Sequence, residues 1–224
     1  MTISETRVER TETRRVREDS APAERCPTCD AEVPQGFRFC GQCGRALAAT
    51  FAPLPGDVVT IAFVDLEGYT SFASRVDDDD VRELILGFHG LVREQVGRHG
   101  GFEVKQMGDG FMLAFSNPAR AVACAADIQR AAAERGADGL SAAIQVSAGL
   151  NSGSAIREGD DFFGHTVNVA SRIADRASGG QVFVSEQTRR LAGQVDGALF
   201  REIGRRSLRG LHGRYRLFEV AWRE

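Results

Sequence analysis

The sequence predicts an α+β domain of the ferredoxin-like order β-α-β-β-α-β, with a small cysteine module in front of it. Runs of β-branched residues alternate with longer segments whose apolar residues recur at helical spacing. A Gly-Asp-Gly turn joins two apolar runs, as is typical of a hairpin. Four of the five cysteines fall in two Cys-x-x-Cys pairs ahead of these segments, which indicates a separate module.

The apolar pattern marks the first strand and the first helix of the domain. Residues 58–64 (VVTIAFV) form a β-branched run that is typical of a buried strand. Residues 81–96 carry apolar side chains three and four apart, which predicts a helix with one buried face. The pair Gly100-Gly101 ends this helix.

A hairpin and a second helix follow. Residues 102–107 and 111–115 flank Gly108-Asp109-Gly110, which predicts two strands joined by a tight turn. Residues 119–133 are rich in alanine and predict a helix. Cys124 falls among small apolar residues of this helix, so we expect it in the core.

The rest of the domain predicts three further elements and a final hairpin-like segment. Residues 144–150 and 181–184 read as strands, and residues 167–177 between them read as a helix. Residues 198–222 are typical of strand, turn and strand. The whole order is β-α-β-β-α-β with later additions.

Composition limits the class of protein. The 224 residues have room for one ordinary domain and a small appendage. The charge of −3 gives no general attraction to nucleic acid or to an anionic membrane. No stretch approaches the roughly 18 apolar residues of a membrane helix, and the first 20 residues lack the apolar core of a secretion signal. We therefore expect a cytoplasmic protein.

Changes in composition divide the chain into four segments. Residues 1–24 are polar and mixed in charge, which predicts a disordered tail. Residues 25–47 hold the paired cysteines, and residues 48–56 contain two prolines and read as a linker. Residues 57–224 form the α+β domain.

The cysteine spacing predicts a structural metal site. Cys26 and Cys29 are separated from Cys40 and Cys43 by ten residues, as in two knuckles that direct four thiolates at one zinc ion. Iron in a similar four-sulfur site is the alternative. The segment resembles the zinc ribbons found at the front of many bacterial multidomain proteins. We expect it to contact protein rather than nucleic acid, because its charge is balanced.

Two constellations in the domain carry chemistry. Asp65 ends a buried strand, and Asp109 lies in the turn of a hairpin that would pair beside it. Two such carboxylates can hold two hard divalent cations around a triphosphate. Asn168 and Arg172 are four residues apart on one helical face, just after Gly164, where a helix start favours an anion.

Three segments carry a resemblance to a known family. They are residues 63–70 (FVDLEGYT), 105–112 (KQMGDGFM) and 161–172 (DFFGHTVNVASR). In order and spacing they resemble the signature segments of the class III nucleotide cyclase catalytic domain, over about residues 57–222. The resemblance implies the cyclase fold with its antiparallel-rich sheet, and a head-to-tail homodimer with two sites at the interface.

The resemblance also implies the role of each matching residue at the metals and the base. Asp65 and Asp109 would bind two Mg²⁺ or Mn²⁺ ions, with the Leu66 carbonyl as a further ligand. Lys105, the one lysine among 28 basic residues, would read the base together with Asp161. A lysine donor and an aspartate acceptor complement the adenine edge and mismatch the guanine edge, which favours ATP over GTP.

The phosphate side of the implied site contains two departures. Asn168 would orient the ribose, and Arg172 would stabilise the pentavalent phosphorus during formation of 3′,5′-cyclic AMP and pyrophosphate. The family often has an arginine where this chain has Ser147, which removes one contact to the triphosphate. Arg209 replaces the late lysine of the family. Six arginines lie between Arg201 and Arg216, and apart from Arg209 they are typical of a solvated face.

Three hypotheses for function follow. The first is a homodimeric adenylate cyclase. The second is a nucleotide-binding regulatory module without turnover, which the Ser147 departure motivates. The third is a zinc-ribbon interaction protein whose large domain only dimerises. The four histidines lack metal-ligand spacing and receive no role: His89, His99, His165 and His212.

Overall fold

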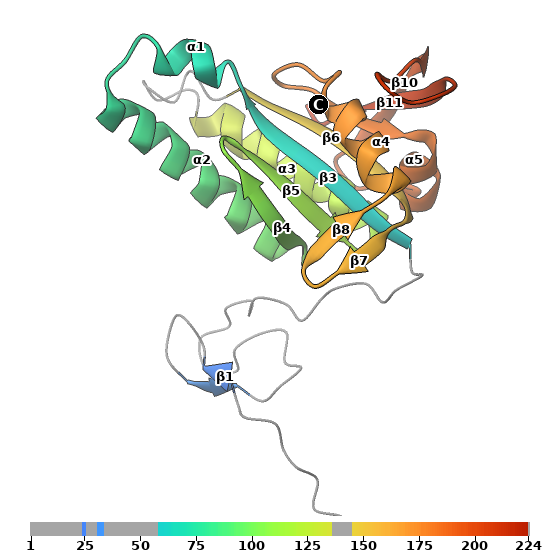
Figure 1. Cartoon of the computed structure of the whole chain (residues 1–224), viewed down its shortest axis with the longest axis horizontal. Coiled ribbons are helices and arrows are strands. Elements are labelled where there is room, and N and C mark those ends of the chain that lie inside the picture. Colours follow the sequence, from blue (N-terminus) through green and yellow to red (C-terminus); the bar gives the residue numbers. More distant parts are fainter. Residues whose placement is uncertain (1–23, 26–30, 34–57, 136–144, 224) are drawn as a thin grey trace, which may run out of the picture. The chain divides into compact units, whose positions relative to one another are not determined.

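The computed structural model divides into two compact units, Met1–Leu47 and Ala48–Glu224 (Figure 1). The described residues are 24–25, 31–33, 58–135 and 145–223. In the first unit, β1 (Glu24–Arg25) pairs antiparallel with β2 (Glu32–Val33). The predicted tail, apart from its last residue, and the predicted linker lie outside the described residues, and so do the four predicted metal ligands, Cys26, Cys29, Cys40 and Cys43.

A seven-stranded sheet of order β10-β11-β9-β6-β3-β5-β4 forms the second unit. Its strands are β3 (Val58–Glu67), β4 (Phe102–Met107), β5 (Gly110–Phe115), β6 (Gln145–Ser154), β9 (Val182–Ser185), β10 (Leu199–Arg206) and β11 (Tyr215–Ala221). The neighbours β6, β3, β5 and β4 are antiparallel, as a β-α-β-β-α-β connection produces. Among the described strands only β6 and β9 pair in parallel. The predicted α+β class with a mostly antiparallel sheet is confirmed.

Five helices accompany the sheet in the described part of this unit. They are α1 (Tyr69–Ala73), α2 (Asp78–Arg98), α3 (Pro118–Arg135), α4 (His165–Ala174) and α5 (Glu186–Ala192). The predicted helices correspond to α2, α3 and α4. Helix α2 begins before the apolar stripe because Asp77 caps it, its side chain accepting from the Asp80 backbone N–H.

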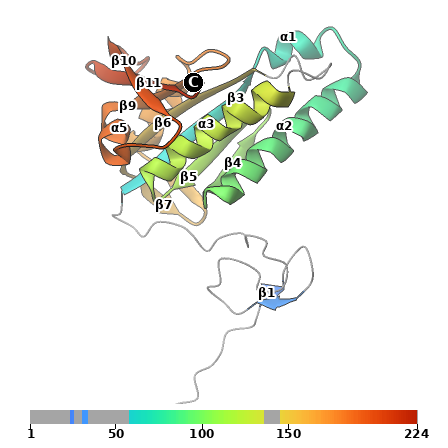
Figure 2. The same cartoon turned by 180° about the vertical axis from the view of Figure 1, so that it is seen from behind.

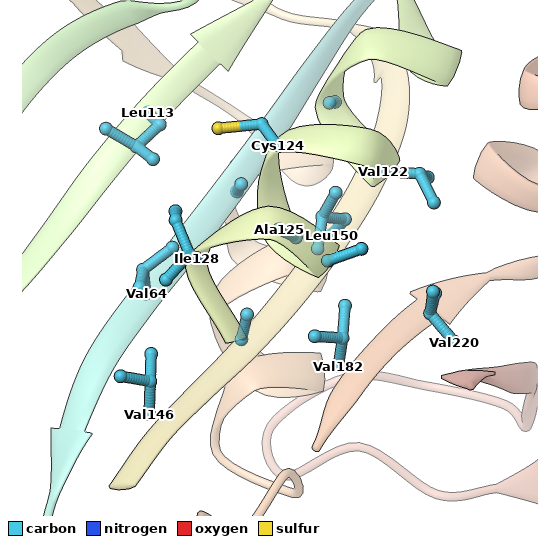
Figure 3. Packing of buried hydrophobic residues seen from close by; sticks show 14 of the residues in the cluster. Val64, Leu113, Val122, Cys124, Ala125, Ile128, Val146, Leu150, Val182 and Val220 are labelled. Atoms are coloured by element: carbon cyan, nitrogen blue, oxygen red, sulfur yellow. The ribbon is translucent and has the colours of Figure 1, made fainter. Parts of the chain in front are cut away.

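Helices α2 and α3 cover one face of the sheet, as the rear view shows (Figure 2). The even-numbered residues of β3 face them, and Val64 is 1% exposed there. Cys124 of α3 is also 1% exposed, and burial raises the pKa of its thiol. Figure 3 shows Cys124 and Ile128 among Val64, Leu113 and the other residues of this cluster. The prediction that Cys124 is a core residue is confirmed.

Helix α4 packs on the opposite face, against β3, β6 and β9 (Figure 1). Val169 and Ile173 face the sheet and are at most 2% exposed. A Cβ added at Gly149 of β6 would lie 2.1 Å from the backbone nitrogen of Ala174. The helix end therefore rests directly on bare strand backbone, which fixes the position of Arg172 two residues before it.

Sequence reasoning missed α1, α5 and a short hairpin, β7 (Ile156–Glu158) with β8 (Asp161–Phe163). These elements are too short to show a periodic apolar pattern. Strand β4, at the sheet edge, also carries a bulge: Glu103 pairs with Leu113, but Lys105 pairs with Met112. The extra residue changes the direction in which Lys105 leaves the strand.

Candidate active site

The sheet brings the predicted metal carboxylates to one end of its central strand. Asp65 of β3 pairs with Gly110 of β5, and Asp109 lies in the turn immediately before Gly110. A Cβ on Gly110 would lie 2.7 Å from Asp65 Oδ1, so glycine leaves room for the carboxylate. Burial, and next the charge of Asp109, raise the pKa of Asp65. The two carboxylates are therefore close enough to repel each other.

This donor set fits hard divalent cations. Carboxylate oxygens are the ligands that Mg²⁺ and Mn²⁺ prefer, and a cation would remove the repulsion between Asp65 and Asp109. A hydrogen bond from the Leu66 backbone N–H lowers the pKa of Asp65 and so favours its charged form. In the described ranges no three His, Cys, Asp or Glu side chains converge on one metal position. The pair needs further oxygens, such as those of a phosphate, to complete the coordination.

The predicted base-reading residues form an ion pair across two strands. Lys105 Nζ on β4 lies 2.6 Å from Asp161 Oδ2 and 2.9 Å from Oδ1 on β8. The hydrogen bond from Lys105 lowers the pKa of Asp161. The ammonium also lies 5.9 Å from the ring centroid of Phe163. Because both side chains are partly exposed, the pair is accessible to a ligand.

The predicted catalytic residues of α4 share the exposed face of that helix. Gly164 is the N-cap residue at a φ of 107°, which favours glycine. Asn168 is exposed, and Arg172 Nη1 donates to Asp175 Oδ2 over 2.7 Å. Arg209 Nη2 lies 3.9 Å from the same oxygen. Sequence reasoning missed Asp175, although its place three residues after Arg172 predicts a contact on one helix face.

Comparison with known proteins identifies the fold. The model of the adenylate and guanylate cyclase catalytic domain matches residues 52–220. The chain belongs to this nucleotide cyclase family.

Individual relatives agree with this assignment. The pH-sensitive adenylate cyclase MT1302 of Mycobacterium tuberculosis is 34% identical over 172 residues, which are 75% of this chain and 42% of the relative. An adenylate/guanylate cyclase/hydrolase structure from Silicibacter pomeroyi has a TM-score of 0.65 at 27% identity, over 72% of this chain and 95% of that one. A monomeric adenylate cyclase structure from Trypanosoma brucei has a TM-score of 0.65 at 23% identity, over 75% and 90%, and supports the fold alone.

Beside the carboxylate pair, this member of the family has a neutral residue. Ser147 of β6 lies directly across from Asp65 of β3 and is 5% exposed. A serine hydroxyl brings no positive charge to this position, so any anion bound beside the carboxylates would need cations from elsewhere in the site. Arg172 and Arg209 meet at Asp175 and are the candidates that the described residues offer.

The predicted charged site residues fall into three separate groups in the described part of the chain. They are the Asp65–Asp109 pair, the Lys105–Asp161 ion pair and the arginines at Asp175. No hydrogen bond or ion pair within this described part joins the carboxylate pair to Asn168 or Arg172.

Every helix described is too short or too polar to span a bilayer.

Proposed function

We propose that the protein is an adenylate cyclase that converts ATP to 3′,5′-cyclic AMP and pyrophosphate. The observation that carries the choice of ATP is the Lys105–Asp161 pair, which presents a donor and an acceptor side by side. Adenine offers an acceptor at N1 and a donor at its amino group, so it can replace each partner of the pair. Guanine offers the inverse and would leave both side chains mismatched.

Asp65 and Asp109 would hold two Mg²⁺ or Mn²⁺ ions, with the Leu66 carbonyl as a further ligand. Such ions lower the pKa of the ribose 3′-hydroxyl and neutralise charge on the phosphates. Asp65 must be ionised for this role, although burial and Asp109 favour its protonated form. The hydrogen bond from the Leu66 backbone N–H lowers the pKa of Asp65 and so favours the ionised form that this role requires.

The residues of α4 supply the remaining groups. Asn168 orients the ribose, and Arg172 stabilises the negative charge that develops on the α-phosphorus oxygens. Arg209 contacts the phosphates through its exposed guanidinium. Because Arg172 is paired with Asp175 in the free chain, it exchanges this carboxylate for a phosphate when the nucleotide binds.

Two sites form at the interface of a homodimer, in each of which the carboxylates of one protomer face Asn168 and Arg172 of the other. This arrangement is supported by the family and by the separation of the charged groups within one chain. It predicts that Asp109→Ala and Arg172→Ala homodimers are each inactive, while a mixture regains activity. Each mixed dimer contains one site with both changes and one intact site.

The decisive measurement is a cyclic-nucleotide assay of the purified chain with Mg²⁺ or Mn²⁺ and either ATP or GTP. We expect cyclic AMP from ATP and little product from GTP. Equal rates with both nucleotides would contradict base selection by Lys105 and Asp161. Mixing that restores no activity, while heterodimers are shown to form, would contradict the shared site.

Exchange of the base-reading pair tests the specificity directly. Lys105→Glu with Asp161→Cys should erode the preference for ATP, because the altered side chains no longer match adenine. The ratio of kcat/KM for ATP and GTP is the measurement. An unchanged ratio would remove Lys105 and Asp161 from base recognition.

A second candidate function is nucleotide binding without turnover, which Ser147 beside Asp65 favours because one phosphate contact is missing. In that case ATP would bind, as calorimetry can show, and no cyclic nucleotide would form. Retention of the carboxylate pair, the Lys105–Asp161 pair and Arg172 favours the enzyme. The same assay decides between the two functions.

We propose that the cysteine module binds one structural zinc ion and contacts a protein partner. The proposal depends on the spacing of its cysteines, and a reducing cytoplasm would keep the thiols available. Metal analysis of the purified chain should give one zinc per chain, and none after serine replaces the four residues Cys26, Cys29, Cys40 and Cys43. One iron per chain would favour the alternative of iron in a four-sulfur site.

A further inference from the structure

Four arginines that the proposed reaction does not use gather in one cavity. Arg189 and Arg190 come from α5, and Arg214 and Arg216 come from the end of the arginine-rich segment, with Arg216 on β11. The cavity has a volume of about 970 Å³. Arg201 and Arg206 belong to the same arginine-rich segment, but they are exposed on β10 and do not line the cavity.

The cavity lies away from the carboxylate pair of the candidate active site, although His165, Thr166 and Val169 of α4 also line it. It is lined by residues 151–153 of β6, whereas Ser147 of the same strand lies across from Asp65. Four to six residues of strand separate the two positions, or about 13–20 Å at ~3.3 Å per residue. None of Asp65, Asp109, Asn168 and Arg172 lines the cavity. A ligand in this cavity would therefore not contact the carboxylate pair.

Three of the four guanidinium groups have no acidic partner in the described part of the chain. Arg216 pairs with Glu186 and Glu202 at 2.9 Å and 2.6 Å. Arg214 donates to the Arg205 carbonyl and Arg190 to the Gln187 amide oxygen, both neutral acceptors. Arg189 lies over the Phe200 ring at 5.6 Å. The cavity therefore has a positive charge that its own acid, Glu186, does not balance.

The remaining wall is ordered before any ligand arrives. Ser152 and Ser185 hydrogen-bond to Thr188 at 3.0 Å and 3.1 Å, and all three side chains are buried. Tyr215 and Phe218 add aromatic surface. A preformed pocket with aromatic walls and a few charged groups is typical of a small-molecule site.

We propose that this cavity binds a small organic phosphate, a phosphomonoester with an apolar portion, at a second site of the protein. Planar guanidinium groups match phosphate oxygens two at a time. Arg189, Arg190 and Arg214 would hold the phosphate, and Tyr215 and Phe218 would contact the apolar portion. The proposal does not depend on the choice of ATP or on turnover.

Calorimetric titration with phenyl phosphate tests the site. Arg189→Ala/Arg214→Ala should raise the dissociation constant of the probe about tenfold or more, because two charged hydrogen-bond donors are lost. Arg201→Ala/Arg206→Ala removes the same charge from exposed residues outside the cavity and should change the constant less than about twofold. Inorganic phosphate should bind more weakly than phenyl phosphate, because it makes no aromatic contact.

Two further variants keep the test decisive. If the alanine variant fails to fold, Arg189→Gln/Arg214→Gln retains side-chain volume and should show the same loss of binding. Arg172→Ala/Arg209→Ala removes the cations of the candidate active site and should leave phenyl phosphate binding intact. Loss of binding in Arg172→Ala/Arg209→Ala would overturn the second site. Equal losses of binding in Arg189→Ala/Arg214→Ala and Arg201→Ala/Arg206→Ala would also overturn it.

Discussion

Compared with the carboxylate pair of β3 and the β4–β5 turn, the charged residues of β4, β8 and α4 are neutralised within the chain. Asp65 and Asp109 are like charges, and the pKa of Asp65 is raised. Lys105–Asp161 and Arg172–Asp175 are ion pairs at 2.6 Å and 2.7 Å. A cation would remove the repulsion between the two carboxylates. Each ion pair separates only when a ligand competes for one of its partners. The two regions should therefore respond differently to metal and to nucleotide.

Removal of a carboxylate should have the largest effect. Asp109→Ala should lower kcat/KM for ATP by about 10³-fold or more, because several kcal/mol of charge stabilisation at the transition state are lost. Glu67→Gln is the control, since Glu67 lies two residues beyond Asp65 on the same strand face and also raises the pKa of Asp65. Equal losses in both variants would assign the effect to local charge and not to metal binding.

Disturbing the support of α4 should have the next largest effect. Gly149→Ala places a methyl group 2.1 Å from the Ala174 nitrogen, so the helix must move. We expect the free energy of unfolding to fall by about 1–3 kcal/mol, with kcat falling as Arg172 is displaced. Gly90→Ala on α2, where no atom lies within 4 Å of the added Cβ, should stabilise by about 0.5–1 kcal/mol and leave kcat unchanged. Chemical denaturation and steady-state kinetics measure both.

Opening the ion pair of α4 should have a smaller effect. Asp175→Asn frees Arg172 and Arg209, so KM for ATP should fall by up to about fivefold, the equivalent of an exposed ion pair. Glu94→Gln breaks the Glu94–Arg98 pair on α2, far along the chain from the site, and should leave KM unchanged. A higher KM in Asp175→Asn would show that Asp175 orients Arg172 for the phosphate instead of competing with it.

The smallest effect concerns pH and stability without metal. A raised pKa means that the folded chain binds the Asp65 proton more readily than the unfolded chain, so stability falls as pH rises through that pKa. Asp65→Asn should therefore raise the free energy of unfolding at pH 7 by less than about 1 kcal/mol, because the Asp65 side chain is only partly removed from water and the solvent that still reaches it screens its charge. The gain should vanish below about pH 4.

A bound metal ion should reverse the effect of Asp65 on stability. Mn²⁺ should raise the Tm of the unaltered chain, because it binds the folded state, and should not raise the Tm of Asp65→Asn. Thermal unfolding with and without Mn²⁺ measures the difference. An equal shift in both chains would place the stabilising ion elsewhere.

The sequence predicted features that depend on local pattern. The β-branched run of β3, the Gly-Asp-Gly turn and the apolar stripe of α2 each specify an element without help from distant residues. The resemblance then selected Asp65, Asp109 and Arg172. The structure adds that the first two lie close together and that the third is held by Asp175.

Other features depend on residues far apart in the chain and do not follow from local pattern, although the resemblance did pair Lys105 with Asp161. Lys105 and Asp161 contact each other only because the β7–β8 hairpin reaches β4, across 56 residues of sequence. The arginine cavity combines α5 with β11, and only the fold shows that Arg214 lines it and Arg201 does not. Helix α5 did carry a local signal, since Ser185 caps its start.

The bulge before Lys105 lies on the outermost strand, at the opposite side of the sheet from β10. Strand β3, which carries Asp65, is hydrogen-bonded on both sides and has little freedom to change. A change in the edge strand β4 can therefore redirect Lys105 while the hydrogen bonds of the central strand β3 are preserved. Under the proposed function, the choice of nucleotide base could therefore change at the edge of the sheet while the proposed metal site on the central strand stays intact.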